Sequence, residues 1–387
     1  MNKKLTTAAL SLLLALPAVA QQSNVNLSYN PQKDTEGLIP FSANLNSPQV
    51  NDDHTVIFRL RAPKAESVAL SGAMTTILGS RGNIPFTKGE DGIWTLTIGP
   101  LPVDMYQYNL VVDGVSMADP NNTYAAFTAM PPYSELIVHG DGPSWWDAKE
   151  GVPHGSITRH IYYSPVTEGE REIYVYTPPQ YDINKKYPVL YLQHGNAENE
   201  YGWSVQGHAG QIMDNLLAQK KAVPFIIVMD YGQGQNIHLV GKFAPKEQDN
   251  RNNDAFAVVL MNDIIPFIEK EYRLNTYAQH RAMAGLSMGG GQTRRITLAT
   301  PTKFGYIGMF SGGTISPEDV QAAKGFQDTA KLVFMSCGSK ENPKVMEAAE
   351  ALNKMGVKAA GYVSEGTAHE WHTWRRSLYQ FAQQIFK

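Results

Sequence analysis

AGLSMGGGQTRR, Ala284–Arg295, is the stretch that decides the fold, because it places one serine among four glycines. The residues before it, HRAMA, are short and apolar like a buried strand, and QTRRITLAT after it is typical of a helix. Residues 285–289 fit the pattern G-x-S-x-G, in which a strained strand-to-helix turn lifts a serine hydroxyl clear of a sheet. Glycines also permit a tight crossing without any chemistry. The flanking strand and helix favour Ser287 as a nucleophile.

Composition limits the class of protein. A chain of 387 residues suits about two domains of ~100–200 residues each. With 43% apolar and 18% charged residues, the composition is that of a globular protein. The net charge of −3 gives no electrostatic reason to expect nucleic acid or an anionic membrane as a partner.

The first twenty residues are typical of a targeting segment. MNKK is basic, LTTAALSLLLALP is apolar, and Ala18–Ala20 has the small-x-small form of a cleavage site. We therefore expect a signal peptide at 1–20, a linker at 21–46, and a periplasmic or secreted protein. The apolar run is shorter than the ~20 residues that span a bilayer, so no membrane anchor is expected. The one cysteine, Cys337, excludes an internal disulfide and is expected to be buried.

Two patterns follow each other in the rest of the chain. Residues 47–141 contain short alternating runs such as HTVIFRLRAP and GIWTLTIGPL, which predict an antiparallel β-sandwich. Residues 142–155, rich in glycine and proline, read as a linker. From 156 to 387 apolar strands alternate with helices, which predicts a mostly parallel sheet covered on both faces, as in the α/β-hydrolase fold. Trp94 is expected in the sandwich core.

A serine hydroxyl needs a base, and in this fold the chain order is serine, acid, histidine. Only His369 and His372 follow Ser287. His369 precedes the final helix and is predicted to be the base, whereas His372 would lie in that helix as a packing residue. The spacing H-E-W-H is one residue short of the H-E-x-x-H zinc motif, so no metal site is expected.

Glu341, just after the strand KLVFMSCGS, is predicted to orient the histidine, with Glu365 and Glu370 as alternatives. The oxyanion donors are predicted to be the backbone N–H of Met288, which follows the nucleophile, and Asn196, in the loop after YPVLYLQHG. His194 ends that strand and is expected to support the loop through a hydrogen bond.

Aromatic residues also follow the strand ends, where an α/β sheet binds its ligand. Trp203 and Tyr231 are candidates for contact with an aromatic acyl group or a sugar, and packing is the alternative for both. Trp371 and Trp374 are expected to pack against the sheet. The polar stretch 232–253 is a candidate rim of the site.

Several segments together resemble a known family: EREIYVYTPPQYD, YPVLYLQHG, DIIPFIEKEYR, RAMAGLSMGG and HEWHTWRRSLYQF. They resemble family 1 of the carbohydrate esterases, which includes feruloyl and acetyl xylan esterases, and related enterochelin esterases share much of the pattern. The resemblance covers Ser156–Lys387 and implies an α/β-hydrolase fold with Ser287, Glu341 and His369 as nucleophile, acid and base. The N-terminal part resembles the early-set, immunoglobulin-like sandwich related to carbohydrate-binding module family 48.

Three features depart from that family's pattern. The acid is usually aspartate, and Glu341 stands in its place. The oxyanion loop usually reads H-G-G-G-G, whereas this chain has HGNAEN, and VMDYGQGQN stands where VMPNG is common. These departures concern the residue that orients the histidine, the hydrogen bond from Asn196 to the oxyanion, and the pocket for the acyl group.

The leading hypothesis is a secreted serine esterase without a cofactor that removes feruloyl groups from plant cell-wall arabinoxylan. Its partners would be feruloylated or acetylated xylan oligosaccharides or polysaccharide. Alternatives are an acetyl xylan esterase, an enterochelin-type siderophore esterase, and a non-catalytic glycan-binding protein. The sequence does not indicate an oligomeric state.

Overall fold

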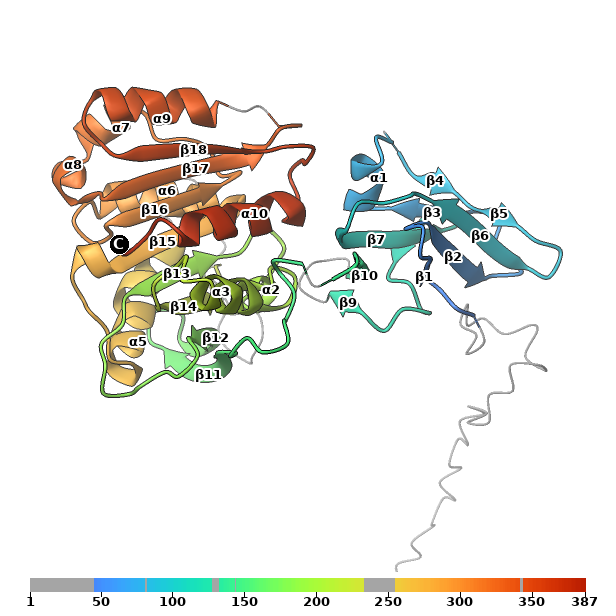
Figure 1. Cartoon of the computed structure of the whole chain (residues 1–387), viewed down its shortest axis with the longest axis horizontal. Coiled ribbons are helices and arrows are strands. Elements are labelled where there is room, and N and C mark those ends of the chain that lie inside the picture. Colours follow the sequence, from blue (N-terminus) through green and yellow to red (C-terminus); the bar gives the residue numbers. More distant parts are fainter. Residues whose placement is uncertain (1–44, 81, 127–131, 143, 233–254, 342–343) are drawn as a thin grey trace, which may run out of the picture. The chain divides into compact units, whose positions relative to one another are not determined.

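The strand that precedes Ser287, β15 (Arg281–Leu286), lies in the middle of an eight-stranded sheet in the computed structural model of the chain (Figure 1). The structure describes residues 45–80, 82–126, 132–142, 144–232, 255–341 and 344–387. The predicted signal peptide, most of the linker at 21–46 and most of the rim at 232–253 lie outside these residues.

The strand order of this sheet is β11-β12-β14-β13-β15-β16-β17-β18. β12 pairs antiparallel with β11 and β14, and every pair from β14 to β18 is parallel. The mostly parallel sheet of an α/β-hydrolase fold is thus confirmed. Its other strands are β11 (Ser156–Ser164), β12 (Gly169–Thr177), β13 (Val189–Gln193), β14 (Ile226–Asp230), β16 (Tyr306–Phe310), β17 (Leu332–Gly338) and β18 (Ala359–Ser364).

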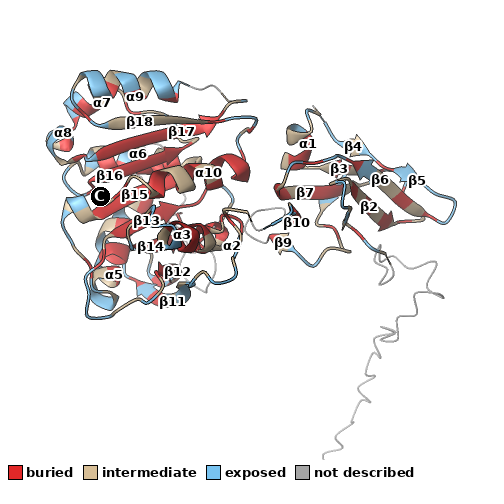
Figure 2. Ribbon diagram, viewed as in Figure 1, coloured by how far each residue is buried: buried red, intermediate tan, exposed pale blue. Residues whose placement is uncertain are grey.

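Helices cover both faces of the sheet, and for this reason its central strands are mostly apolar. Every residue of β13, β14, β15, β16 and β17 is buried, as the continuous red of these strands in Figure 2 shows. Cys337, on β17, is buried as predicted. The helices of this region are α2 (Gly202–Val205), α3 (Ala209–Ala218), α4 (Ala255–Val259), η1 (Leu260–Ile264), α5 (Ile265–Glu271), η2 (Ala278–His280), α6 (Met288–Ala299), α7 (Pro317–Ala322), α8 (Phe326–Thr329), α9 (Val345–Lys354) and α10 (Trp371–Ala382).

Two separate apolar clusters mark the two faces. One contains Ile212 and Met213 of α3 together with Leu378 and Phe381 of α10. Another contains residues of α4, η1 and α5, with Ile296 of α6. The turn that contains Ser287 therefore lies at the end of a strand that is packed on both sides.

The helical segment from 255 to 271 is interrupted by a π-helical turn at Leu260–Ile264. Pro266 begins the next turn and has no N–H to donate to the carbonyl four residues earlier. A wider turn just before the proline is a way to accommodate that missing bond.

The N-terminal described part is all-β apart from one short helix, α1 (Ala73–Ile77). Its sheets have the orders β1-β2-β6-β5 and β4-β3-β7-β10-β9, with β8 paired to β7, and all pairs are antiparallel. Trp94 is buried in their shared core, and its indole N–H donates to the carbonyl of Ala62 at 2.9 Å. The early-set relationship stays a prediction. The strands are β1 (Gln49–Val50), β2 (Val56–Arg61), β3 (Val68–Ser71), β4 (Ile84–Pro85), β5 (Thr87–Lys88), β6 (Ile93–Ile98), β7 (Asp104–Val112), β8 (Val115–Met117), β9 (Ala125–Ala126) and β10 (Tyr133–Val138).

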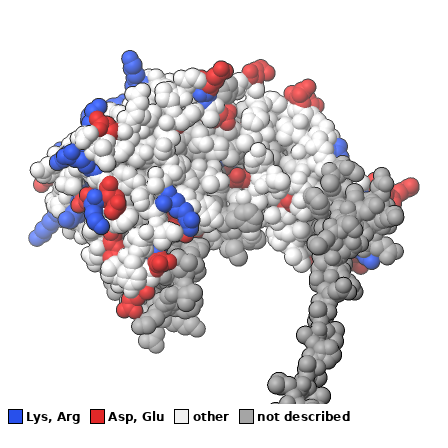
Figure 3. Space-filling view, turned by 90° about the horizontal axis from the view of Figure 1, so that it is seen from below, with Lys and Arg blue, Asp and Glu red and all other residues white. Residues whose placement is uncertain are grey.

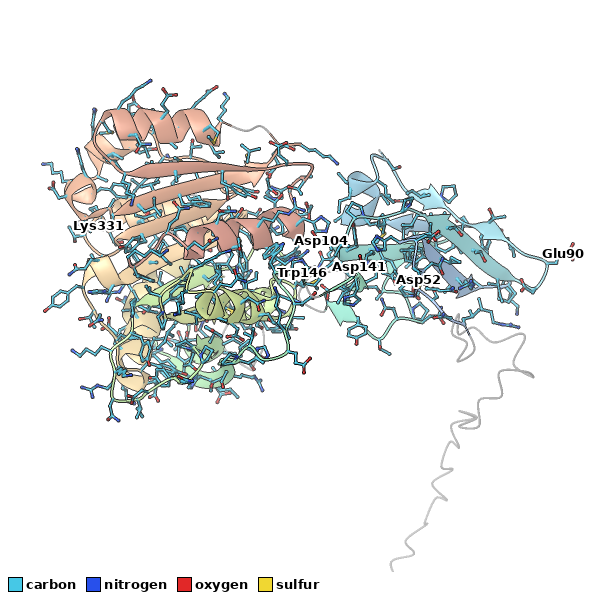
Figure 4. All side chains as sticks on the ribbon, in the orientation of Figure 1. Asp52, Glu90, Asp104, Asp141, Trp146 and Lys331 are labelled. Carbon is cyan, nitrogen blue, oxygen red and sulfur yellow. The ribbon has the colours of Figure 1, made fainter. Side chains whose placement is uncertain are left out.

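The stretch 142–155, predicted as a linker, contains a buried anchor. Trp146, labelled in Figure 4, is 1% exposed and packs edge-on against His208, with ring centroids 5.6 Å apart. The side-chain amide of Asn215, on α3, donates to the carbonyls of Trp145 and Asp147 at 2.9 and 2.8 Å. These residues are therefore fixed against α3.

The surface of the protein carries charged side chains of both signs. Lysine and arginine side chains are interspersed with aspartate and glutamate on the face seen in Figure 3. Within the described ranges, no helix is long and apolar enough to pass through a lipid bilayer.

We expect Trp146→Ala to lower the free energy of unfolding by about 3–5 kcal/mol, because it removes a large buried side chain and leaves a cavity. Urea denaturation of the full chain measures this loss. Tyr277→Ala is the control, since Tyr277 is 70% exposed and its removal should change stability by less than about 0.5 kcal/mol. Equal effects of the two substitutions would contradict the anchoring role.

Candidate active site

Ser287 stands on a sharp turn between β15 and α6. Its backbone has φ 49° and ψ −112°, and its N–H donates to the carbonyl of Phe310 on the neighbouring strand β16 at 2.8 Å. A non-glycine residue at positive φ costs on the order of 1–3 kcal/mol and persists only when its surroundings fix it. The local geometry is that of a nucleophile elbow.

Glycines make this turn possible because backbone lies where side chains would project. A Cβ on Gly285 would come within 2.5 Å of the Gly289 carbonyl carbon, and one on Gly289 within 2.5 Å of the His194 oxygen. A Cβ on Gly290 would come within 2.8 Å of the Gly312 Cα. Ser287 is thus surrounded by four close-packed segments: strand β15, helix α6 and the loops after β13 and β16. They approach one another at distances that only glycine allows.

The side chains of Ser287, His369 and Glu341 form one hydrogen-bonded chain. His369 Nε2 lies 2.8 Å from Ser287 Oγ, and His369 Nδ1 lies 2.8 Å from Glu341 Oε2. An ionised carboxylate can only accept, so Nδ1 carries the proton and Nε2 is free to accept from the serine hydroxyl. The three residues come from the ends of β15, β18 and β17, which are neighbours in the sheet apart from the intervening β16.

Glu341 is held as an anion. Burial favours its neutral form, but hydrogen bonds from His369, the N–H of Gly338 at 2.7 Å and Ser311 Oγ at 2.7 Å outweigh that effect, so the pKa of Glu341 lies below its usual value. The other two carboxylates considered for this role lie elsewhere. Glu370 accepts from the His372 N–H as the N-cap of α10, and Glu365 is exposed.

The segment after His369 is packed as expected. Trp371 and Trp374 are 3% and 7% exposed, and the Trp374 ring meets the His369 imidazole edge-on with centroids 5.3 Å apart. His372 is buried, and its Nε2 lies 2.7 Å from the carbonyl of Met105. Helix α10 thus packs against the loop that carries His369.

The loop after β13 holds a turn beside the elbow. His194 Nε2 accepts from the Gly232 N–H at 2.9 Å, so its Nδ1–H donates to the Gly195 carbonyl at 2.7 Å. Burial lowers the pKa of His194 to about 4, which keeps it neutral. The predicted supporting role of His194 is confirmed.

Of the two predicted oxyanion donors, Met288 follows Ser287 as the first residue of α6. Asn196 is exposed on the turn after His194, and its backbone N–H has no hydrogen bond within the described residues. The preceding N–H, of Gly195, donates to Glu198 Oε2 at 2.8 Å. Neither Asn196 nor the next residue, Ala197, donates its backbone N–H in a hydrogen bond within the described residues, and Asn196 is the one of the two that was predicted as a donor.

The two predicted aromatic contacts lie deeper than expected. Trp203 is 1% exposed, its indole N–H donates to the Gln193 carbonyl at 2.8 Å, and its ring packs edge-on against Phe310. The structure does not bring it to the surface of the site. Tyr231 is 9% exposed and stacks on His194 with centroids 5.6 Å apart, so it packs beside the turn that begins at Gly195.

Two residues of the site carried no sequence signal strong enough to predict them. Ser311, which holds Glu341, follows β16 with φ 50°, and its place at a strand end is the one available hint. Glu198 accepts hydrogen bonds on both oxygens, and burial raises its pKa to about 7. No group of three or more histidine, cysteine, aspartate or glutamate side chains suited to a metal ion occurs in the described part of the chain.

A known protein family matches the part of the chain that contains these residues. The family model described as "Putative esterase" matches residues 164–385. The chain belongs to this esterase family. It is 40% identical over 349 residues to an endo-1,4-beta-xylanase/feruloyl esterase of Xylanibacter ruminicola, and the match covers 88% of this chain. It covers 46% of that relative, so the chain spans less than half of the relative's length.

Solved structures agree with the family. A CE1 ferulic acid esterase from Anaeromyces mucronatus, determined with ferulic acid, superposes with a TM-score of 0.52 at 26% identity, covering 65% of this esterase and 98% of that chain. The enterobactin esterase of Shigella flexneri, at 17% identity, has a TM-score of 0.61 over 85% of this chain and 92% of its own, and shows the fold alone. The family match, the Xylanibacter relative and the Anaeromyces structure support a carboxylic ester hydrolase.

Gly289→Ala should abolish esterase activity and lower stability, because the new methyl group would lie 2.5 Å from the His194 backbone oxygen. Gly291→Ala is the matched control in the same helix: its methyl group would meet only the end of the Arg295 side chain, at 3.3 Å. Alanine there should raise stability by about 0.5–1 kcal/mol. Activity on p-nitrophenyl acetate and urea denaturation separate the two, and an active Gly289→Ala variant would refute the close approach.

The lowered pKa of Glu341 predicts a pH dependence. A carboxylate whose pKa is depressed by folding stabilises the protein above its unfolded pKa, and this contribution disappears as the pH falls through its folded pKa. The difference in unfolding free energy between wild type and Glu341→Gln should therefore be constant at neutral pH and shrink below the usual glutamate value of 4.5. Urea denaturation at pH 7, 5 and 3.5 measures it. A difference that grows toward acid would contradict the assignment.

Proposed function

We propose that the chain is an exported serine esterase that releases feruloyl groups from plant cell-wall arabinoxylan, with Ser287, His369 and Glu341 as its catalytic triad. The observation that carries the proposal is the pair of 2.8 Å contacts from the His369 imidazole to Ser287 Oγ and Glu341 Oε2. The elbow at Ser287 presents the hydroxyl at a strand end, which is where an α/β sheet binds its ligands.

In the first half of the reaction, Ser287 Oγ attacks the ester carbonyl while His369 Nε2 takes its proton. Glu341 stabilises the imidazolium that forms, since its carboxylate accepts from Nδ1–H. The oxyanion of the tetrahedral intermediate would accept from the N–H groups of Met288 and Asn196, each worth roughly 3–4 kcal/mol in a preformed site. His369 then protonates the departing sugar oxygen, and the acyl group remains on Ser287.

In the second half, water attacks the acyl-serine ester. His369 Nε2 takes a proton from that water and returns one to Ser287 Oγ as the intermediate collapses, which releases the carboxylic acid. Each proton transfer uses the same nitrogen, so the Glu341–His369 hydrogen bond is needed in both halves.

The relatives support the substrate class. One is named both an endo-1,4-beta-xylanase and a feruloyl esterase, and the other was solved with ferulic acid. A feruloyl ester linked to xylan is a substrate consistent with both names, and we propose it as the substrate of this chain. Export rests on the signal-peptide pattern at 1–20, outside the described residues.

Ser287→Ala should lower kcat on methyl ferulate by about 10⁴-fold or more, because no other group can form the acyl intermediate. Release of ferulic acid, followed by its absorbance, measures this in parallel with wild type. The same pair of proteins is tested on acetylated xylan and on a catechol-type siderophore ester. Preference for one of these would replace the feruloyl assignment, and near-normal turnover by Ser287→Ala would refute the mechanism.

A further inference from the structure

Glu198 joins the two segments that carry the donor and the base of the proposed reaction. Its Oε2 accepts from the backbone N–H of Gly195 at 2.8 Å, at the start of the oxyanion turn. Its Oε1 accepts from the indole N–H of Trp371 at 3.1 Å, at the first residue of α10 and two residues after His369. One carboxylate therefore bridges parts of the chain that are 173 residues apart.

The oxyanion turn depends on this side chain more than on its own backbone. Ala197 has φ 61°, a left-handed conformation that alanine adopts only when its surroundings fix it. The backbone bond that closes the turn, from the Glu198 N–H to the Gly195 carbonyl, is long at 3.4 Å. The shorter bond from the Gly195 N–H to the carboxylate fixes the turn with the Asn196 N–H unbonded.

On its other side Glu198 is connected to the histidine through packed rings. Trp371 meets Trp374 edge-on with centroids 5.3 Å apart, and Trp374 meets His369 edge-on, also at 5.3 Å. The Trp374 indole N–H donates to Ser311 Oγ at 3.2 Å, and Ser311 in turn donates to Glu341. A shift of Trp371 would thus reach His369 through Trp374, and it would reach Glu341 through Trp374 and Ser311.

We infer that Glu198 is a positioning residue that fixes the Asn196 N–H relative to His369 while the tetrahedral intermediate forms. The inference rests on the proposed serine-esterase mechanism and adds to it a residue that does not touch the substrate. Preformed donors act only if their geometry is held before the reaction. Burial raises the pKa of Glu198 to about 7, and the Gly195 N–H, the Trp371 indole and His369 act in the opposite direction. The Glu198 carboxyl group thus lies in an environment that disfavours its charged form. There it accepts hydrogen bonds from both segments.

The test compares Glu198→Gln, Trp371→Phe and the double variant by steady-state kinetics on methyl ferulate and p-nitrophenyl acetate. In Glu198→Gln the amide oxygen can still accept from Gly195, but its NH₂ group faces the indole N–H, so two donors meet. Trp371→Phe keeps an aromatic ring and removes that donor. Glu350→Gln, whose side chain is 69% exposed, is the control for a glutamate-to-glutamine change.

We expect Glu198→Gln to lower kcat by about 10–100-fold with KM within twofold, because only transition-state stabilisation is lost. The double variant should be no slower than Glu198→Gln, since without the indole the two donors no longer conflict. Unchanged kcat, a change confined to KM, or losses that multiply in the double variant would overturn the inference. If Glu198→Gln does not fold by circular dichroism, Trp371→Phe alone decides: it must lower kcat while KM stays constant.

Failure of the proposed function gives a different result. If wild type hydrolyses p-nitrophenyl acetate but not methyl ferulate, the feruloyl assignment fails while the Glu198 comparison is still made on p-nitrophenyl acetate. If Ser287→Ala remains active, the triad fails and the inference falls with it.

Discussion

The structure depends on one steric constraint, the contact between backbone atoms where β15 turns into α6. Gly285 and Gly289 approach so closely that a methyl group on the first would lie 2.5 Å from the second. With this approach Ser287 adopts a strained backbone with positive φ, as in a nucleophile elbow, where the serine hydroxyl stands clear of the sheet. The same contact brings the loop after β13 within reach of the serine, because Gly289 also abuts the His194 oxygen.

Around this constraint, the site is assembled from strand ends. The turn that we propose for the oxyanion follows β13, Ser287 follows β15, Ser311 follows β16, Glu341 follows β17, and His369 follows β18. Two of these side chains contact groups outside the proposed triad: Glu341 accepts a hydrogen bond from Ser311, and His369 packs against Trp374. The site is therefore preorganised by hydrogen bonds and packing within the chain.

The sequence predicted the parts of this arrangement that depend on chain order and strand ends. Glu341 and His369 could be found because few acids and histidines follow Ser287 at the end of a predicted strand. The glycine-rich pattern itself identified the elbow, since its spacing has a steric cause.

Other features depend on packing, which composition does not encode. Trp203 and Trp146 both stand in polar or glycine-rich surroundings, yet each is 1% exposed because tertiary contacts cover it. Glu198 looked like one of several acids in HGNAENE, and only the positions of Gly195 and Trp371 give it two donors. The π-helical turn before Pro266 likewise depends on hydrogen bonds that a periodic apolar pattern does not reveal.

The edge-on contact between the Trp374 indole and the His369 imidazole has a consequence for spectroscopy. A protonated imidazole quenches indole fluorescence more strongly than a neutral one, and a bound aromatic acid nearby would absorb the emitted light. Trp374 is one of six tryptophans in the chain, and its share of the emission would report the charge of this imidazole without an attached dye.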